Sequence, residues 1–419
     1  MSNSYSVECF PRGANKYVRH PPIRFNIGSD LVFSLAGPIG PAGLSDSAAD
    51  LLDFAGAIYQ IERQFRGRQR TNPIEQVSLS ITLRKPKAWT DGTLTSVKRI
   101  LQLLGNAVWD VELKSGLRAG IPSTDRSKPP RCTQVALFSG GMDSTCGAAT
   151  CRDEAERTQL VGFYTRQMTL QEELAQTLGF KRLAQCRMQW KGKPGLTHSF
   201  YYRSFFFLCL AAAIAESWEA RRILQFENGV LATAVPPAPS WRMTKHAHPL
   251  LHQYATDLFG SLFGGRWQIV NPFLHLTKRQ CLDAAANSYG KTELYKIIAK
   301  TQTCWYYTSN RIVGALKTPN KACGACIPCI VRHTALPKEP TVFDLDQDKI
   351  RNKAVLGRAF RSYFGVLDEV LRAKDLDSFY EVLPAPGRMV VDSNLGISLA
   401  QMHELFHTFA KEFMRSYRH

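Results

Sequence analysis

A short polar and glycine-rich stretch follows an apolar run in the middle of the chain. Residues 135–138 read VALF, a run of the kind that a parallel sheet buries on both faces, and SGGMDST follows at 139–145. Two successive glycines allow positive φ values and let backbone N–H groups approach a ligand closely. The residues after them suit the first turns of a helix, whose free N–H groups attract an anion. The stretch therefore predicts a turn that wraps a phosphate.

Asp143 is the exceptional member of this turn. Hydroxyl groups of Ser139, Ser144 and Thr145 add donors for a phosphate. A carboxylate beside bound phosphates makes sense chiefly with a divalent cation between them, usually Mg²⁺. Helix capping is the ordinary role for such an aspartate. The strand before the turn and the helix after it favour a nucleotide site over a chance turn.

Four of the eleven cysteines fall in one part of the chain. Cys323, Cys326 and Cys329 form a CxxCxxC run, and Cys304 precedes it. Such a run turns tightly enough for three sulfurs to meet one ion, and a distant fourth cysteine completes a closed, structural Zn²⁺ site. A [4Fe–4S] cluster uses the same spacing, and His333 is an alternative fourth ligand.

Composition places these motifs in a globular protein. The chain has 419 residues, 44% of them hydrophobic, which is enough for two or three domains. The longest strongly apolar run, at 205–215, is too short to span a bilayer. Residues 1–17 contain no apolar segment of a signal peptide. We therefore expect a cytoplasmic protein without a membrane partner, whose reduced cysteines are available to bind metal.

Strand-like and helix-like segments alternate between residues 131 and 335. They predict an α/β core with a doubly wound parallel sheet, in which ligands bind beyond the carboxyl ends of the strands. The turn at 139–145 lies at such an end. Candidate strands are 135–138, 159–165, 222–227 and 267–273, and candidate helices are 146–156, 169–179, 201–218 and 248–263.

Two further regions flank this core. Residues 1–128 contain helix-like and strand-like segments and are expected to form a small α+β module, joined to the core by a polar linker at 122–131. Residues 336–419 contain apolar positions at helical spacing and are expected to form a C-terminal helical domain.

The turn resembles a known family signature. SGGMDS at 139–144 is similar to the SGGxDS motif of the PP-loop ATPases, HUP-like enzymes that split ATP into AMP and pyrophosphate while adenylating an oxygen of their substrate. A Walker A motif is absent from the sequence. The resemblance implies catalytic roles for Ser139, Asp143 and Ser144. It also implies an ATP-binding loop made of Leu137, Phe138, Ser139, Gly140, Gly141, Met142, Asp143, Ser144 and Thr145.

The cysteine motif narrows the resemblance. CGACIPCIVR at 323–332, together with SGGMDS, is similar to the QueC branch of PP-loop ATPases, the 7-cyano-7-deazaguanine synthases, in which four cysteines hold a structural zinc. Segments around Arg203 and Lys278 also resemble that branch and imply that both residues contact phosphate. Solvated or helix-capping bases are the ordinary roles for such residues. The resemblance covers about residues 131–335.

The segment expected to contact the substrate departs from that branch. Asn228 matches an asparagine of the synthases, but their acidic, aromatic-rich segment is replaced by the longer loop AVPPAPSWR at 234–242. Trp241 and Arg242 are candidate stacking and anion contacts in this loop. A surface loop stiffened by its prolines is an equally supported interpretation.

The resemblance implies that a deazapurine-like carboxylate is adenylated and then attacked by an amine. In the synthases the amine is ammonia, and a second adenylation converts the amide into a nitrile. The length and domain order of the chain resemble QatC, the QueC-like component of a bacterial anti-phage defence system. This resemblance implies protein partners from the same operon, and a protein amine as acceptor is a hypothesis that the altered loop supports.

The formal net charge of +18 favours polyanionic partners. Arg63, Arg66, Arg68 and Arg70 form a basic patch, which is interpreted either as a phosphate contact or, slightly better, as a solvated helix end. The patch lacks interleaved aromatic residues, which disfavours nucleic acid as a partner.

Two other functions stay open at this stage. One is a tRNA-modifying PP-loop ATPase, whose thiolating members need a reactive cysteine; the candidates are Cys146, Cys151 and Cys186, although burial is the ordinary role of each. The other is a defence scaffold with a degenerate ATP site, which the intact Ser139, Asp143 and Ser144 argue against.

Overall fold

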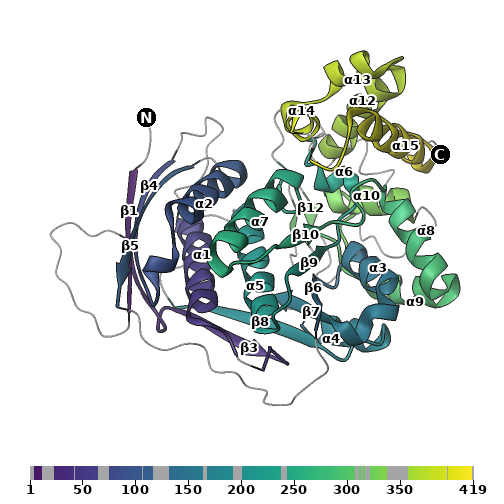
Figure 1. The fold of residues 1–419 in the computed structure, drawn as a ribbon. Helices are drawn as coiled ribbons and strands as arrows, with labels where there is room; N and C mark the ends of the chain where they lie inside the picture. The colour runs from purple at the N-terminus through teal and green to yellow at the C-terminus, as the bar shows by residue number, and fades with distance from the viewer. Residues whose placement is uncertain are drawn as a thin grey trace.

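The computed structural model describes most of the chain, and all structural statements concern the described part. Its residues are 4–11, 23–41, 43–64, 75–105, 107–116, 132–163, 168–191, 201–236, 243–306, 311–312, 315–316, 321–336, 357–393 and 395–417. They form a mixed α/β structure with a large, mostly parallel sheet and a C-terminal helical region (Figure 1). The predicted fold class is confirmed.

A single sheet of ten strands runs through the molecule in the order β10-β9-β6-β7-β8-β3-β2-β1-β4-β5. Neighbouring strands pair in parallel except β3 and β8, which pair antiparallel. The strands of the predicted core are β6 (Gln134–Leu137), β7 (Thr158–Phe163), β8 (Leu183–Trp190), β9 (Arg222–Gln225) and β10 (Gln268–Val270). The strands of the N-terminal part are β1 (Ser4–Pro11), β2 (Ile23–Ile27), β3 (Leu31–Ala36), β4 (Glu75–Leu83) and β5 (Ala107–Ser115).

Helices cover both faces of the core half of the sheet (Figure 1). Successive strand residues point to opposite faces, so Val135 and Ala136 of β6 belong to two different hydrophobic cores. One core includes α1 (Asp46–Gln64), α2 (Asp91–Leu104), α5 (Arg203–Ser217) and α7 (Pro249–Phe263). The other includes α3 (Met142–Thr150), α4 (Met168–Thr177), α8 (Lys278–Tyr289) and α9 (Lys291–Lys300). Short 3₁₀ helices occur at η1 (Pro86–Ala88) and η2 (Arg152–Arg157).

The N-terminal part shares its core with the predicted ATPase domain. Buried residues of β1, β4, α1 and α2 form one continuous cluster with those of α5 and α7. The carboxylate of Glu62 in α1 accepts hydrogen bonds from the backbone N–H groups of Tyr201 and Tyr202, both at 3.0 Å, where α5 begins. The predicted linker at 122–131 lies outside the described residues. We expect the two parts to unfold together.

Gly40 provides a test of this shared core. Its N–H donates to Ser217 Oγ at the end of α5 (2.9 Å), and a Cβ at Gly40 would lie 1.6 Å from the carbonyl oxygen of Ser217. We expect Gly40→Ala to lower the free energy of unfolding by about 2–3 kcal/mol and to shift one cooperative urea transition. Gly92→Ala is the control, because its Cβ would meet neighbours at 3.6 Å, an ordinary contact. Two separate transitions in the wild-type chain would contradict the shared core.

The C-terminal helices pack against two short elements of the core. The helices are α12 (Arg358–Arg372), α13 (Leu376–Val382), α14 (Ala385–Asp392) and α15 (Leu399–Tyr417). They share a hydrophobic cluster with α6 (Gly229–Ala232), with Val235 and Met243, and with α10 (Ile327–Ala335).

A small hairpin pairs β11 (Arg311–Ile312) with β12 (Ala315–Leu316). None of the helices among the described residues is long and apolar enough to cross a membrane.

Candidate functional site

The predicted phosphate turn connects β6 to α3. Gly140 has a φ of +76°, a conformation that favours glycine. Ser139 Oγ accepts a hydrogen bond from the Gly141 N–H (3.1 Å) and lies 3.1 Å from Ser144 Oγ. Ser144 Oγ donates to the Gly141 carbonyl at 3.1 Å. The turn is thus fixed by its own serines at the carboxyl end of β6, where parallel sheets bind ligands.

Two features of the turn are compatible with a bound anion. A Cβ on Gly141 would lie 3.1 Å from Ser139 Oγ and 3.5 Å from the carbonyl oxygen of Gln302, so a side chain there would crowd the turn. Thr145 Oγ1, in the first turns of α3, is buried without a hydrogen-bond partner in the described structure. A buried hydroxyl without a partner is costly, and a bound phosphate would supply an acceptor.

Asp143, Lys278 and Asn228 meet directly behind this turn. Lys278 Nζ lies 2.5 Å from Asp143 Oδ2, and Asn228 Nδ2 donates to the same oxygen at 3.1 Å. The lysine is 1% exposed and the aspartate 7%. The sequence predicted a role for each residue, and the structure brings them together from α3, α8 and the capping position directly before α6.

Glu227 adds a second carboxylate that the sequence analysis missed. Its Oε1 accepts from Asn228 Nδ2 (2.8 Å) and its Oε2 lies 2.6 Å from His246 Nε2. Asn271 fixes the peptide of Glu227, since its side chain accepts from the Glu227 N–H (3.3 Å) and donates to the Glu227 carbonyl (2.8 Å). Glu227 follows β9 and directly precedes Asn228, so its position after a predicted strand could have marked it as a site residue. Nothing in the sequence around His246 indicated a role in the site.

The electrostatics of the two carboxyl groups fit a divalent cation. Burial is the main cause that raises the pKa of Asp143 to about 7, with Lys278 opposing and the Glu227 charge adding to the shift. Burial also disfavours ionised Glu227, but hydrogen bonds with His246 and Asp143 outweigh it and lower the pKa of Glu227. Asp143 Oδ1 is buried without a partner in the described structure. An Mg²⁺ ion would bind that oxygen and favour the ionised form of Asp143.

Arg203 lies at the start of α5, close to the same network. Burial lowers the pKa of Arg203, while Tyr59 and Glu62 of the N-terminal part partly offset that shift. Burial opposes a charged His246, but the hydrogen bond with Glu227 and the Glu227 charge raise the pKa of His246, and the Arg203 charge partly offsets that rise. Arg203 thus belongs to the surroundings of the site, held between the N-terminal part and the His246–Glu227 pair.

The substrate loop is described only at its two ends. Trp241, Arg242 and residues 237–240 lie outside the described residues, as do Arg66, Arg68 and Arg70 of the basic patch. Val235, at the start of the loop, packs in the C-terminal cluster, where a Cβ on Gly387 would lie 3.0 Å from its Cγ2. The C-terminal helices therefore help to position the segment that follows Asn228.

The C-terminal helix α15 also contacts the beginning of α8. Glu412 Oε1 accepts a hydrogen bond from Thr277 Oγ1 (2.9 Å), and Thr277 is the capping residue directly before Lys278. Glu412 Oε2 is buried without a partner in the described structure. Burial is the main cause that raises the pKa of Glu412 to about 7, against the opposing hydrogen bond from Thr277.

The burial of Glu412 makes the stability of the folded chain depend on pH. A carboxyl group whose pKa is raised in the folded state stabilises it below the unfolded pKa, and that contribution is lost as the pH rises. We expect the free energy of unfolding of Glu412→Gln, relative to the wild type, to rise by about 1–3 kcal/mol between pH 5 and pH 8. Urea unfolding at several pH values measures it. Glu404→Gln, on the same helix, is the control, and equal pH dependence of all three chains would contradict the assignment.

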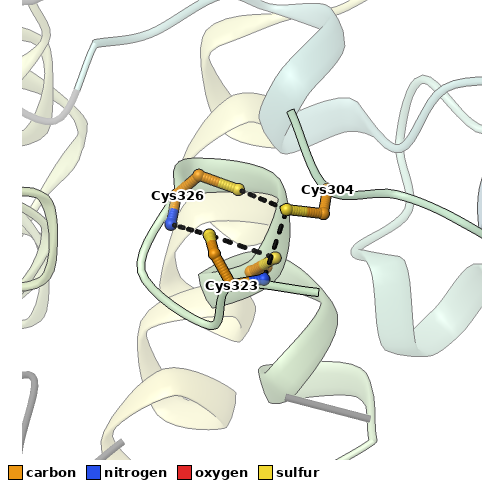
Figure 2. A group of neighbouring side chains, drawn as sticks. Cys304, Cys323 and Cys326 are labelled. Carbon is orange, nitrogen blue, oxygen red and sulfur yellow. Dashed lines mark hydrogen bonds between the residues drawn. The ribbon is translucent and has the colours of Figure 1, made fainter. Parts of the chain in front are cut away.

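The four cysteines form one compact cluster, and Figure 2 shows three of them, Cys304, Cys323 and Cys326, side by side. Their sulfur atoms all lie within 4.8 Å of one another, and the Cys304–Cys326 and Cys323–Cys329 pairs are each 4.0 Å apart. A tetrahedral zinc ion with Zn–S bonds of about 2.3 Å places its sulfurs about 3.8 Å apart. The cluster is consistent with a single zinc ion, and an iron–sulfur cluster would need wider spacing because it places several irons between the sulfurs.

Backbone N–H groups that point at the sulfur atoms also support a metal site at the four cysteines. Tyr306 and Cys323 each donate a backbone N–H to Cys304 Sγ at 3.3 Å. Ala325 and Cys326 donate in the same way to Cys323 Sγ, at 3.4 and 3.3 Å. Such donors stabilise thiolates that bind a metal. His333 is not in the cluster: its ring contacts Tyr417 with centroids 4.8 Å apart.

The cysteines proposed for thiolation have the wrong environment for a nucleophile. Burial raises the pKa of Cys146, Cys151 and Cys186, and Cys146 and Cys186 are fully buried. A raised pKa keeps the thiol protonated and unreactive. The structure therefore gives no support to a thiolating reaction at these residues.

Comparison with curated proteins finds similarity to one class of enzyme over about half of the chain. Two 7-cyano-7-deazaguanine synthases, from two strains of Caulobacter vibrioides, are each 27% identical to this chain over 232 residues. The match covers 48% of this chain and 92% of each synthase. The chain is thus distantly homologous to these synthases over about half its length. No protein-family model matches the chain.

Proposed function

We propose that this protein is an ATP-dependent enzyme that adenylates a carboxylate on a deazapurine-like substrate, releasing pyrophosphate, and then transfers the acyl group to an amine. The buried contact of Asp143 with Lys278, directly behind the Ser139–Gly141 turn, carries the proposal. A buried ion pair is expensive to keep, and it stands where a nucleotide would bind in this fold. The distant homology to 7-cyano-7-deazaguanine synthases supports the substrate class.

The chain's own groups would bind and orient the triphosphate. Free N–H groups at the start of α3 and the hydroxyls of Ser139, Ser144 and Thr145 would donate to the phosphates. Lys278 balances negative charge while Asn228 orients the Asp143 carboxylate. Asp143 and Glu227 would hold Mg²⁺, which neutralises charge on the departing pyrophosphate when it is bound. These groups are fixed before the reaction, so they stabilise developing charge without reorganising.

The reaction has two displacement steps. A carboxylate oxygen of the substrate attacks the α-phosphorus of ATP, a new P–O bond forms, and the bond to the β-phosphate oxygen breaks with release of pyrophosphate. The amine nitrogen then attacks the carbonyl carbon of the acyl adenylate. The C–O bond to AMP breaks, the amine loses a proton, and an amide remains.

The first experiment measures AMP and pyrophosphate. ATP, Mg²⁺ and the purified chain are incubated with 7-carboxy-7-deazaguanine, with benzoate as an unrelated carboxylate, or with neither. We expect AMP release that depends on the deazaguanine. No stimulation by the deazaguanine, with ATP still bound, would contradict the substrate class, and absence of ATP binding would contradict the enzyme as a whole and favour the scaffold alternative.

We further propose that the acceptor is a protein amine, in a bacterial anti-phage defence system with partners from the same operon. About half of the chain has no counterpart in the synthases, and the segment after Asn228 packs against the added C-terminal helices. Incubation with the neighbouring gene products, followed by intact-mass measurement, tests the acceptor. A mass increase by one acyl group that needs ATP is expected. Formation of the nitrile from ammonia alone would contradict a protein acceptor, and equal plaque counts with wild-type and Asp143→Ala chains would contradict the defence role.

The net charge of +18 keeps tRNA as a second candidate substrate. Burial keeps the thiols of Cys146 and Cys186 protonated, which opposes a thiolation reaction, although another tRNA modification would not need them. AMP release stimulated by tRNA and unaffected by the deazaguanine would favour this candidate.

A further inference from the structure

The segment that precedes the first cysteine of the metal cluster touches the phosphate turn. Residues 301–304 connect the end of α9 to Cys304. The backbone N–H of Gln302 donates to the carbonyl oxygen of Gly140 at 3.3 Å. A Cβ on Gly141 would lie 3.5 Å from the carbonyl oxygen of Gln302. The two segments therefore pack backbone against backbone, at the two glycines that shape the turn.

The side chain of Arg332 also binds residues 301–304. It lies in α10, three residues after Cys329, and is 1% exposed. Its Nη1 donates to the carbonyl oxygen of Thr301 (2.9 Å), to Thr301 Oγ1 (2.8 Å) and to Thr303 Oγ1 (3.2 Å). Its Nη2 donates to the carbonyl oxygen of Ile298 (2.9 Å) at the end of α9. A planar, forked guanidinium can make this set of bonds, whereas a lysine ammonium cannot.

Residues 301–304 are thus fixed at three points. Cys304 ties the segment to the cluster, Arg332 ties it to α10, which also carries Cys329, and Gln302 ties it to the turn. Four cysteines that share one ion have fixed relative positions, and four cysteines without an ion lose that constraint. Displacement of Cys304 would therefore also move the backbone amide of Gln302, which lies two residues before Cys304 in the chain.

We propose that metal binding at the four-cysteine cluster positions the phosphate turn through residues 301–304, with Arg332 as the positioning residue. Affinity for the pyrophosphate end of a nucleotide therefore depends on the metal and on Arg332. The inference concerns residues distant from the reacting atoms and rests on the proposed binding of ATP at residues 139–145. A cluster that stabilises only its own region would leave nucleotide affinity unchanged.

The test compares ATP and AMP binding in the full-length chain. AMP lacks the pyrophosphate that the turn would hold, so it reports on the rest of the site. We expect Arg332→Lys to weaken ATP binding about tenfold or more, to leave AMP binding within about twofold, and to retain one zinc per chain by metal analysis. Arg388→Lys is the matched control, because Arg388 also donates to two backbone carbonyl oxygens, those of Glu381 and Leu383, but in the C-terminal helices.

Removal of the metal by a chelator provides the second arm. We expect ATP affinity to fall while AMP affinity is retained, and amide hydrogen exchange in a peptide covering residues 139–143 to become faster. Unchanged ATP affinity and unchanged exchange in a folded, metal-free chain would overturn the proposal, as would equal loss of ATP and AMP binding in Arg332→Lys. If the wild type binds no ATP but exchange at 139–143 still depends on the metal, the coupling stands and the proposed function fails.

Discussion

Asp143→Asn is expected to lower the rate of AMP and pyrophosphate formation by about 10²–10³ fold. The substitution keeps an oxygen that can accept the Asn228 hydrogen bond but removes the charge that would hold Mg²⁺ beside the phosphates. Because the pKa of Asp143 is raised to about 7, the neutral amide resembles a protonation state that the free protein already populates near neutral pH. The fold should therefore survive, and the loss should be one of activity.

Three measurements separate these effects. Urea unfolding should show a smaller loss of stability than Lys278→Met causes, because the Glu227 charge still compensates Lys278. ATP binding without Mg²⁺ should be retained, and the Mg²⁺ concentration needed for half-maximal AMP release should rise. Asp283→Asn is the control, since Asp283 lies on the exposed side of α8, 3.8 Å from Arg279. Activity within threefold of the wild type in Asp143→Asn would remove Asp143 from the proposed site.

Local patterns in the sequence predicted the parts of this fold that have strong periodicity. The apolar face of α1, the alanine-rich α5 and the turn after β6 follow from residue types within one element. The antiparallel pairing of β3 with β8 does not, because it joins strands far apart in the chain. β8 was missed, since LAQCRMQW at 183–190 mixes polar and apolar residues without a clear period. The shared N-terminal core follows from that pairing and could not be predicted.

The candidate site likewise contains residues that the sequence predicted and residues that it did not. The residues of the turn are contiguous and three of the four cysteines are regularly spaced, so the chemistry of both groups could be predicted from the sequence alone. A phosphate contact by Lys278 was inferred only from a family resemblance, and its ion pair with Asp143, at 2.5 Å, became visible only in the structure. His246 was missed because its function in the network depends on Glu227, which approaches it from another element. The contact of Gln302 with Gly140 involves only backbone atoms and leaves no trace in residue types.

The buried charges of this network also predict a large effect on stability. Lys278 is the cation that compensates Asp143, and Glu227 adds negative charge close by. Removing one partner of a buried ion pair leaves an uncompensated charge. We expect Lys278→Met, which keeps the length of the side chain, to lower the free energy of unfolding by about 3–5 kcal/mol at pH 8.

The loss should be smaller at pH 6, and the direction follows from linkage. Without the lysine the pKa of Asp143 rises further above its unfolded value, so the folded state takes up a proton as the pH falls and regains stability. Urea unfolding at pH 6 and pH 8 measures this difference. Lys296→Met, which removes an exposed pair with Glu293, should change stability by less than about 0.5 kcal/mol.

The double variant Lys278→Met/Asp143→Asn distinguishes electrostatics from packing. If the uncompensated charge causes the loss, the neutral asparagine should restore most of the stability at pH 8 and remove the difference between the two pH values. AMP formation should stay at or below the level of Asp143→Asn, because neither the cation nor the carboxylate is present at the phosphate turn. A double variant as unstable as Lys278→Met alone would show that the methionine fails to pack against α3, and the ion pair would then carry no special weight in the site.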